Sequence, residues 1–490
     1  MHISKVEKLM SKIKKAINAE LGKKNYDNVL NLVTVASYIL YQCNIEYIDK
    51  DLEQTVEKVA TELQLDILGN DTLKDDVVLF WDGFGFNERG LCQIYLRALT
   101  KHKKVMYVTY SDRANSIPDI HKILEENNGE CFYITRNKNN PLAMINELNG
   151  YVKKFAPKHL FFYSWPDDIV ATPLLYAYEN KLTRYQINLT DHAFWLGAGC
   201  FDKYINFREY GARVSDEYRE VPRDKNVVVP FYPIIDYDKE FQGYPFELKD
   251  NQKVIFSGGA LYKTLGEGNK YYSMIEHILE KYEDVIFWYA GYGNDTELKK
   301  VINKYPNRVY FTKERSDLYQ VLQHCHFYFS TYPLCGGLMF QYAAMAGKVP
   351  VTLKYGNVSD DFLINQKKID VEFDSVEDLY AEVDKLLSDE AYYQERSELM
   401  KHSVISEELF NEEVGKLVSG IVSDKYQPEY EHIDTVAFRQ LYLENMTYAE
   451  MTSMLFRKHM MKIALRYYPF EFIRGTMRTI KKKIKKKLNK

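Results

Sequence analysis

Cysteine is scarce in this chain, and long apolar runs are absent from it. Six cysteines occur among the 490 residues, and they are widely scattered with no Cys-x-x-Cys pair. This spacing predicts neither a disulfide framework nor a zinc ribbon, and it is typical of a reducing compartment. Residues 1–20 interleave lysines with apolar residues instead of forming a signal peptide, and no later run is long enough to cross a bilayer. We therefore expect a cytoplasmic protein that is neither secreted nor transmembrane.

The formal net charge of −4 conceals a strong asymmetry. After position 455 the chain carries thirteen Lys or Arg residues against the single acid Glu471, a local balance of +12 that leaves −16 for the rest. An acidic body argues against nucleic acid as a ligand, because nucleic acid binding requires a basic face on the folded domain. The cationic end of the chain instead predicts a polyanionic partner.

Residues 454–490 mix apolar side chains with a lysine cluster at 481–487. Such a composition is typical of a segment that lies in the lipid headgroup region of an anionic membrane. We expect this tail to hold the protein peripherally on the inner face of the plasma membrane. The alternative is a solvated tail without a binding role, which Pro469 and Gly475 favour because they interrupt a continuous helix.

Two series of alternating strands and helices follow a purely helical start. The first series has expected strands at 75–81, 104–110, 130–136, 158–165 and 184–190. A polar stretch at 237–252, which we interpret as a linker, separates it from expected strands at 253–259, 285–291, 309–312, 326–330 and 349–353. Strands joined by helical crossovers form parallel sheets, and their ligands bind at the carboxyl ends of the strands.

The sequence therefore predicts an α/β protein with two Rossmann-like domains that face a cleft. The predicted parts are an N-terminal helical appendage (1–70), a first Rossmann-like domain (71–236), a second Rossmann-like domain (251–425) and C-terminal helices with the basic tail (426–490).

Glycine-bearing turns follow three of the expected strands, at 81–90, 256–269 and 334–340. A single turn of this kind carries little weight, because strand-to-helix turns favour glycine, but three of them indicate an anion site. Gly336 and Gly337 precede a helix whose unpaired N–H groups and dipole suit a phosphate. Lys263, five residues after Gly258, adds a cation; the alternative for Lys263 is a solvated surface lysine.

The segments SGGALYK (257–263) and TYPLCGGLMFQYAAMAGKVPV (331–351) resemble the donor domain of GT-B glycosyltransferases. They are most similar to the branch that contains protein O-linked N-acetylglucosamine transferase and the bacterial adhesin N-glycosyltransferases, and the resemblance covers about residues 76–425. It implies that a UDP-sugar binds to Gly258, Gly259, Lys263, Thr312, Gly336, Gly337 and Leu338.

The chain departs from that branch in two ways. Hydroxyl residues after the turn and an acidic residue on the helix are replaced here by Leu338, Met339, Gln341 and Tyr342, so nucleotide binding must depend more on backbone N–H groups. The paired glutamates of many retaining GT-B enzymes are also missing, since no carboxylate lies between positions 330 and 351. We therefore expect an inverting reaction.

Inversion requires a general base that takes the proton of the acceptor, and histidine suits this role. Our candidate is His192, which follows an expected strand and has Asp191 beside it; a structural histidine is the alternative. We expect Trp195 to stack on a sugar face. The first glycine-bearing turn adds the acceptor-side candidates Gly83, Gly85, Asn87 and Arg89.

Together these inferences predict a metal-independent inverting glycosyltransferase that uses no cofactor. It would move a hexose or N-acetylhexosamine from a UDP-sugar to a lipid-linked glycan or a protein in bacterial surface glycan synthesis. We do not expect 324–326 (HCH) or 236–238 (DYD) to bind metal. Two alternatives stay open: a protein O- or N-glycosyltransferase of surface adhesins, and a non-catalytic GT-B partner that binds the acceptor for another glycosyltransferase.

Overall fold

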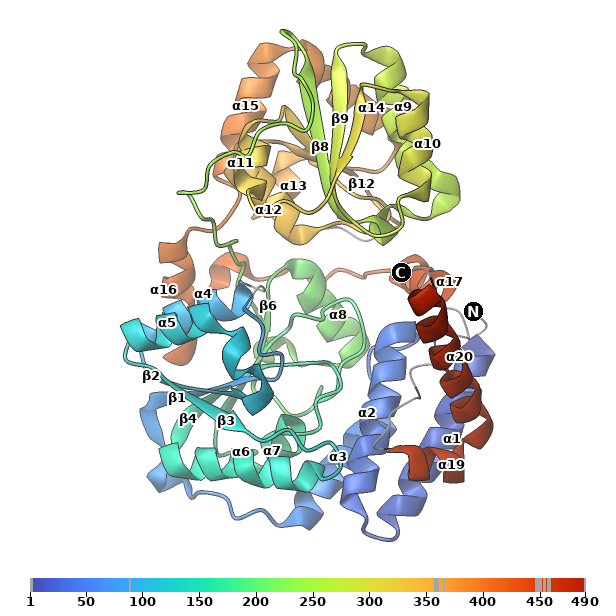
Figure 1. Ribbon diagram of the computed structural model, residues 1–490. Helices are drawn as coiled ribbons and strands as arrows, with labels where there is room; N and C mark the ends of the chain where they lie inside the picture. Colours follow the sequence, from blue (N-terminus) through green and yellow to red (C-terminus); the bar gives the residue numbers. More distant parts are fainter. Residues whose placement is uncertain are drawn as a thin grey trace. The chain divides into compact units, whose positions relative to one another are not determined.

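The chain folds into two compact units, each of which is built on one parallel sheet covered by helices (Figure 1). The computed structural model describes residues 3–87, 90–356, 361–364, 366–445, 452, 455 and 460–488. Unit 1 consists of residues 1–229, 411–432 and 438–490, and unit 2 consists of residues 230–410 and 433–437. The predicted α/β class with two Rossmann-like domains is confirmed.

The sheet of unit 1 has the strand order β3-β2-β1-β4-β5-β6-β7, and all neighbouring strands are parallel. Its strands are β1 (Lys74–Asp82), β2 (Lys104–Tyr110), β3 (Glu130–Ile134), β4 (Pro157–Tyr163), β5 (Thr183–Ile187), β6 (Lys203–Asn206) and β7 (Asn226–Val228). The chain changes its direction of progress across the sheet between β1 and β4. In open α/β sheets this switch point is where ligands bind.

The sheet of unit 2 has the order β10-β9-β8-β11-β12-β13, with its switch point between β8 and β11. Its strands are β8 (Lys253–Ala260), β9 (Val285–Tyr292), β10 (Val309–Thr312), β11 (Phe327–Phe329), β12 (Pro350–Leu353) and β13 (Glu372–Phe373). Its helices are α9 (Lys270–Lys281), α10 (Thr296–Lys304), α11 (Leu318–Gln323), α12 (Gly337–Met345), α13 (Gln366–Ile369), α14 (Val376–Ser388) and α15 (Glu390–Lys401). Central strands such as β8 and β9 read as continuous apolar runs because helices cover both of their faces.

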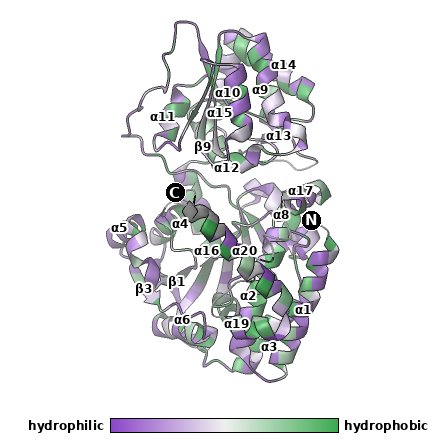
Figure 2. Cartoon of the chain, turned by 45° about the vertical axis from the view of Figure 1, so that its right-hand side comes forward, coloured by the Kyte–Doolittle hydropathy of each residue, from purple (hydrophilic) through white to green (hydrophobic). Residues whose placement is uncertain are grey.

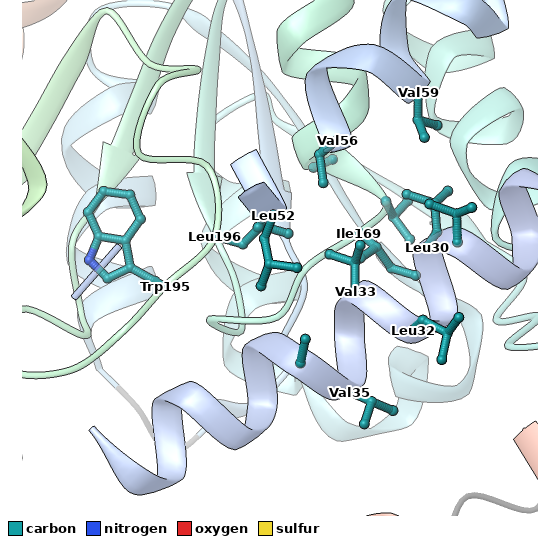
Figure 3. Packing of buried hydrophobic residues seen from close by; sticks show 14 of the residues in the cluster. Leu30, Leu32, Val33, Val35, Leu52, Val56, Val59, Ile169, Trp195 and Leu196 are labelled. Carbon is teal, nitrogen blue, oxygen red and sulfur yellow. The ribbon is translucent and has the colours of Figure 1, made fainter. Parts of the chain in front are cut away.

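The helices that begin the chain are part of unit 1, which corrects the prediction of a separate appendage at 1–70. Unit 1 contains α1 (Ile3–Leu21), α2 (Tyr26–Cys43), α3 (Lys50–Leu63), α4 (Leu91–Thr100), α5 (Pro118–Glu126), α6 (Pro141–Phe155), α7 (Ala171–Ala177) and α8 (Glu209–Arg219). Figure 3 shows Leu30 and Val33 of α2 and Leu52 of α3 in one cluster with Ile169 and Leu196. The helices and the sheet therefore share one hydrophobic core.

The C-terminal part of the chain also returns to unit 1. Helices α16 (Glu407–Val418) and α17 (Val436–Asn445) are followed by α19 (Met461–Tyr467) and α20 (Pro469–Leu488). Ala464, Tyr468 and Phe472 are buried in the core that contains α1, and Tyr467 donates a hydrogen bond to the buried carboxylate of Glu20. As predicted, the helix is interrupted before Pro469, which begins α20 at a position where a missing N–H is tolerated, whereas Gly475 lies inside α20 without interrupting it.

The predicted linker at 237–252 belongs to unit 2. Its polar sequence contains three aromatic side chains, Phe241, Tyr244 and Phe246, that pack against the core of that unit, and the Phe241 ring stacks on His324 with centroids 4.0 Å apart. Among the described residues, no helix combines the length and the apolar character that a bilayer-spanning segment requires.

Candidate active site

The two segments that resemble the donor domain meet at the switch point of unit 2. Lys263 lies in a short 3-10 helix, Leu261–Thr264, directly after β8, and the Gly336–Gly337 turn lies between β11 and α12. The backbone N–H of Leu334 donates to the carbonyl of Lys263 over 3.3 Å. In return, the Lys263 ammonium donates to the carbonyl of Cys335 over 3.4 Å. A flexible cation is thereby held beside the amino end of a helix, where the first N–H groups have no intrahelical partners.

Strand register places further donor-side candidates at the same sheet edge. Gly258 pairs with Ala290, and Ala290 pairs with Thr312, so these residues stand level across three strands. Gly259 follows Gly258 near the end of β8. The hydroxyl of Thr312 accepts a hydrogen bond from the Trp288 indole over 3.0 Å. Thr312 therefore lies at the carboxyl edge of the sheet, as predicted for a donor contact, but its hydroxyl is already bonded to Trp288.

Gly337 lacks a side chain for a packing reason. A Cβ atom at this position would come within 2.4 Å of the Phe362 ring, whereas a Cβ at Gly336 would meet nothing closer than the Lys263 ammonium at 3.7 Å. The absent side chain lets Phe362 pack against the start of α12. This packing role of Gly337 is compatible with an anion that binds to the backbone N–H groups of the turn.

Three large apolar or aromatic side chains are exposed at the carboxyl ends of β8 and β9 and at the start of α12. Leu338, at the start of α12, is 45% exposed, and Tyr262 and Tyr292, at the ends of β8 and β9, are 59% and 55% exposed. The sequence analysis missed both tyrosines, although Tyr292 is the last residue of β9 and Tyr262 comes two residues after β8. Large exposed side chains at the ligand-binding edge of an α/β sheet suit contacts with a flat nucleobase.

The two polar residues that replace the branch's ribose contact support the fold of unit 2. The Gln341 amide donates to the carbonyl of Phe231 over 2.8 Å, and the Tyr342 hydroxyl donates to the carbonyl of Ile234 over 3.0 Å. Both side chains therefore hold the segment that enters unit 2.

Asp82 organises the first glycine-bearing turn from within. Its carboxylate is fully buried, and it accepts hydrogen bonds from the N–H groups of Phe84 and Gly85 and from the Tyr107 hydroxyl, over 2.8, 2.9 and 2.7 Å. Burial raises the pKa of Asp82, although these hydrogen bonds oppose the shift. Gly83 continues β1 with an N–H that donates to Tyr163 over 2.9 Å. We conclude that Asp82 shapes the turn and does not contact a substrate.

Asn87 closes the other end of that turn. Its side chain donates to the Asp119 carboxylate over 2.6 Å and accepts from the Asp119 N–H over 2.9 Å, so it fastens the turn to the amino end of α5. This engagement argues against the predicted acceptor contact. The candidate Arg89 lies outside the described residues.

Trp195 is buried, which contradicts the prediction that it stacks on a sugar. Only 2% of the residue is exposed, and the Arg219 guanidinium lies 4.9 Å from its ring centroid. Trp165, which follows β4 at the switch point of unit 1, is 37% exposed and packs on Phe84 with centroids 4.7 Å apart. Trp165 is therefore an available aromatic at this sheet edge. The sequence feature that could have identified Trp165 is its position at the end of the apolar stretch KHLFFYSW.

His192 and Asp191 form a hydrogen-bonded pair. The distance from His192 Nδ1 to Asp191 Oδ1 is 3.2 Å, and 29% of the histidine side chain is exposed. Two bonds from Arg208, of 2.6 and 3.1 Å, hold the buried Asp191 carboxylate. Burial alone would raise the pKa of Asp191, but the charge of Arg208 and the hydrogen bonds from His192 and Arg208 lower it to about 2. An ionised carboxylate only accepts, so Nδ1 carries the proton and Nε2 is the basic nitrogen.

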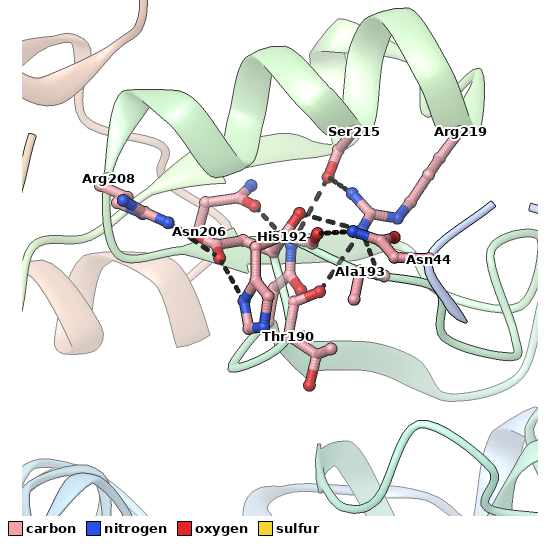
Figure 4. A network of polar contacts seen from close by, with 10 residues as sticks. Asn44, Thr190, His192, Ala193, Asn206, Arg208, Ser215 and Arg219 are labelled. Carbon is pink, nitrogen blue, oxygen red and sulfur yellow. Dashed lines mark hydrogen bonds and ion pairs between the residues drawn. The ribbon is translucent and has the colours of Figure 1, made fainter. Parts of the chain in front are cut away.

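Arg219 and Asn44 hold the loop that carries His192, and both point toward its backbone (Figure 4). Arg219, at the end of α8, donates to the carbonyls of Thr190, Asp191 and Ala193 over 3.3, 3.0 and 2.7 Å. Asn44, which follows α2, donates to the carbonyl of His192 itself over 2.9 Å. All four consecutive carbonyls of 190–193 are thus fixed by buried side chains.

Aromatic side chains of α17 border the imidazole. The Tyr442 ring stacks on His192 with centroids 6.1 Å apart, and the Phe438 ring meets it edge-on at 6.3 Å. Sequence reasoning missed both residues, because they lie about 250 positions further along the chain and only the fold brings them back.

The two metal-like motifs have other roles. The Asp236 carboxylate accepts from the N–H of Asp238 over 3.2 Å, which is the geometry of a turn. His324 and His326 face different carbonyls, those of Gln320 and Leu386. In the part of the chain that the structure describes, no group of three or more His, Cys, Asp or Glu is arranged to hold a metal ion.

Two Rossmann-like units of this kind define the GT-B glycosyltransferase fold, and this chain has it. An O-GlcNAc transferase of Thermobaculum terrenum superposes with a TM-score of 0.52 at 12% identity, covering 90% of this chain and 81% of its own. A glycosyltransferase from Rickettsia africae ESF-5 superposes with a TM-score of 0.52 at 13% identity, covering 70% of this chain and 98% of its own. No protein-family model and no curated protein sequence matches the chain. At such identities the likeness establishes the fold alone.

Proposed function

We propose that this protein is a metal-independent, inverting glycosyltransferase that moves a hexose or N-acetylhexosamine from a UDP-sugar to a lipid-linked glycan or a protein acceptor. The observation that carries the proposal is the pairing of Lys263 with the amino end of α12 at the switch point of a GT-B unit. The ammonium and the unpaired N–H groups supply positive charge for a diphosphate without requiring a metal. Tyr262, Tyr292 and Leu338 border the same edge and suit the nucleobase.

The proposed reaction uses the basic nitrogen of His192. Nε2 takes the proton of an acceptor hydroxyl while that oxygen attacks the anomeric carbon from the side opposite the diphosphate. The bond between that carbon and the diphosphate oxygen breaks, and UDP leaves with the bonding electrons. Asp191 keeps the tautomer and stabilises the imidazolium that forms. Trp165 is the proposed acceptor-side aromatic.

A second candidate function is a non-catalytic partner that binds the acceptor for another glycosyltransferase. It is favoured by Gln341 and Tyr342, which serve the fold where the resembled branch contacts the ribose. The two candidates differ in turnover, so one series of measurements separates them.

The donor site is tested by calorimetric titration of the full chain with UDP. We expect Lys263→Ala to weaken UDP binding by roughly 1.5–3 kcal/mol, the scale of a hydrogen bond to a charged group. Lys253→Ala is the matched control, because Lys253 begins the same strand at the opposite sheet edge and should leave UDP affinity unchanged. Equal affinity of both folded variants would remove Lys263 from the site.

The base is tested by measuring UDP release with a panel of UDP-sugars. We expect His192→Ala to lower turnover by about 100-fold or more with UDP affinity nearly intact. UDP binding by the native chain without release from any donor would favour the non-catalytic partner. Release at a normal rate by the variant would show that another group is the base.

A further inference from the structure

One face of α20 presents a continuous apolar stripe to solvent. Its members are Phe470, Ile473, Met477, Ile480 and Ile484, which are 81%, 49%, 62%, 52% and 54% exposed. Their spacing of three or four residues places them on one side of the helix. Met461 and Leu465 of the preceding α19 are also exposed. These seven are among only eighteen exposed large apolar side chains in the described part of the chain. Exposed apolar side chains are therefore concentrated on α19 and α20.

The opposite face of α20 is already occupied. Tyr468 and Phe472 are buried in the core of unit 1, and Glu471 forms an ion pair of 2.5 Å with Lys12 of α1. The Arg478 guanidinium donates to the Thr452 hydroxyl over 3.2 Å. Because these contacts fix the rotation of the helix, α20 cannot turn its stripe inward, and anything that covers the stripe must come from outside the unit.

The helix that carries the stripe is strongly basic in sequence. Residues 469–488 contain eight Lys or Arg against the single acid Glu471. Helix α1, which α19 and α20 contact through Tyr467 and Glu471, adds the exposed lysines Lys5, Lys8, Lys12 and Lys15. In Figure 2, which colours residues by hydropathy, hydrophobic and hydrophilic segments alternate along α20. An apolar stripe flanked by cations matches a surface whose interior is apolar and whose border is anionic.

We propose that the surface formed by the α20 stripe and the flanking basic residues of α1 and α20 docks on an anionic lipid bilayer. The five stripe side chains enter the boundary between headgroups and acyl chains, and the lysines and arginines meet the lipid phosphates. A second copy of the chain fits this surface poorly, because it would bring two strongly cationic helices together. This inference does not depend on the chemistry of the site, and its test uses no sugar nucleotide.

The test is flotation of the full chain with phosphatidylcholine vesicles, with and without phosphatidylglycerol, over a range of salt concentrations. Truncating the tail is unsuitable, because it would uncover the core under Tyr468 and Phe472. The stripe variant is therefore Ile473→Ser with Met477→Ser, which leaves every charge in place. Its matched control is Ile421→Ser, which removes a 57% exposed apolar side chain elsewhere in the same unit.

A second pair of variants tests the charges. Lys481→Ser with Lys483→Ser removes two exposed lysines from α20, and Lys299→Ser with Lys300→Ser removes two from α10 of unit 2. We expect the native chain to float with anionic vesicles only and to be released by salt. The stripe variant should lose roughly tenfold or more in vesicle partitioning, because each buried methylene contributes to membrane binding. The α20 lysine variant should bind more weakly, and both controls should behave like the native chain.

Three outcomes would overturn the proposal. One is no binding of the native chain to anionic vesicles, and another is equal binding to neutral and anionic vesicles. The third is a native dimer, seen by sedimentation equilibrium, that the stripe variant disperses while its vesicle binding stays native; this would identify a second copy as the occupant. Near-native unfolding temperatures of all variants are required, and the exposure of the substituted side chains makes that the expected result.

Discussion

A single buried arginine fixes most of the backbone around the proposed base. Arg219 reaches three of the four carbonyls of 190–193, and burial lowers its pKa from the ordinary value to about 10. A charged side chain is expensive to bury unless its donors are used. One terminal nitrogen of Arg219, Nη2, donates to all three carbonyls of the loop that presents His192, and the other donates to Ser215 over 3.4 Å. We therefore regard Arg219 as a positioning residue that acts through the backbone of that loop.

Replacing Arg219 by lysine should separate positioning from stability. A lysine keeps the charge but lacks the planar fork of donors, so we expect Arg219→Lys to lower turnover by about tenfold or more while UDP affinity stays native. The matched control is Arg184→Lys, because Arg184 is equally buried in the same unit and binds Asp202 and the carbonyl of Leu175. Unfolding temperature, UDP affinity and turnover are measured for both. If Arg219→Lys and Arg184→Lys lost turnover equally and were equally stable, Arg219 would have no special positioning role.

At the scale of elements, the packing at the start of α12 requires glycine at position 337 but not at the adjacent Gly336. We expect Gly337→Ala to destabilise unit 2 by about 1–3 kcal/mol, the cost of overpacking, because its Cβ would strike the Phe362 ring. Gly336→Ala should change stability little, since its Cβ has only ordinary contacts and its φ of −110° suits any residue. Urea unfolding of both variants measures the difference. Two equally stable variants would show that Phe362 moves aside without cost.

Most strands could be predicted from the sequence because they are continuous apolar runs bounded by turns. The expected ranges at 104–110 and 309–312 coincide with β2 and β10. Strands β6, β7 and β13 were missed, since each of them contains only one or two apolar residues. The exposure of a loop aromatic could not be predicted either. Trp195 and Trp165 both follow strands, and only long-range packing decides that the first is buried and the second is not.

For the whole molecule, the division into parts was the least predictable feature. Amphipathic periodicity identified α1, α2 and α3 as helices, but it could not say what their apolar faces cover. The structure joins both ends of the chain to the first sheet in one core. The carboxylate of Glu20 in α1 shows how the two ends of the chain are joined. Burial alone would raise its pKa, but hydrogen bonds from Asn28, from Lys23 and from Tyr467 of the C-terminal helix α19 lower it to about 2.

Two phenylalanines in α20 allow a direct test of whether the C-terminal helices belong to the core of unit 1. Phe472 is 4% exposed in the core of unit 1, whereas Phe470, two positions earlier, is 81% exposed. We expect Phe472→Ala to destabilise the protein by about 3 kcal/mol or more, because it leaves a cavity among α1, α19 and α20. Phe470→Ala should stay within about 0.5 kcal/mol of the native chain and should weaken only vesicle binding. Chemical unfolding compares the two, and a Phe472→Ala variant as stable as Phe470→Ala would mean that the C-terminal helices are not part of the core.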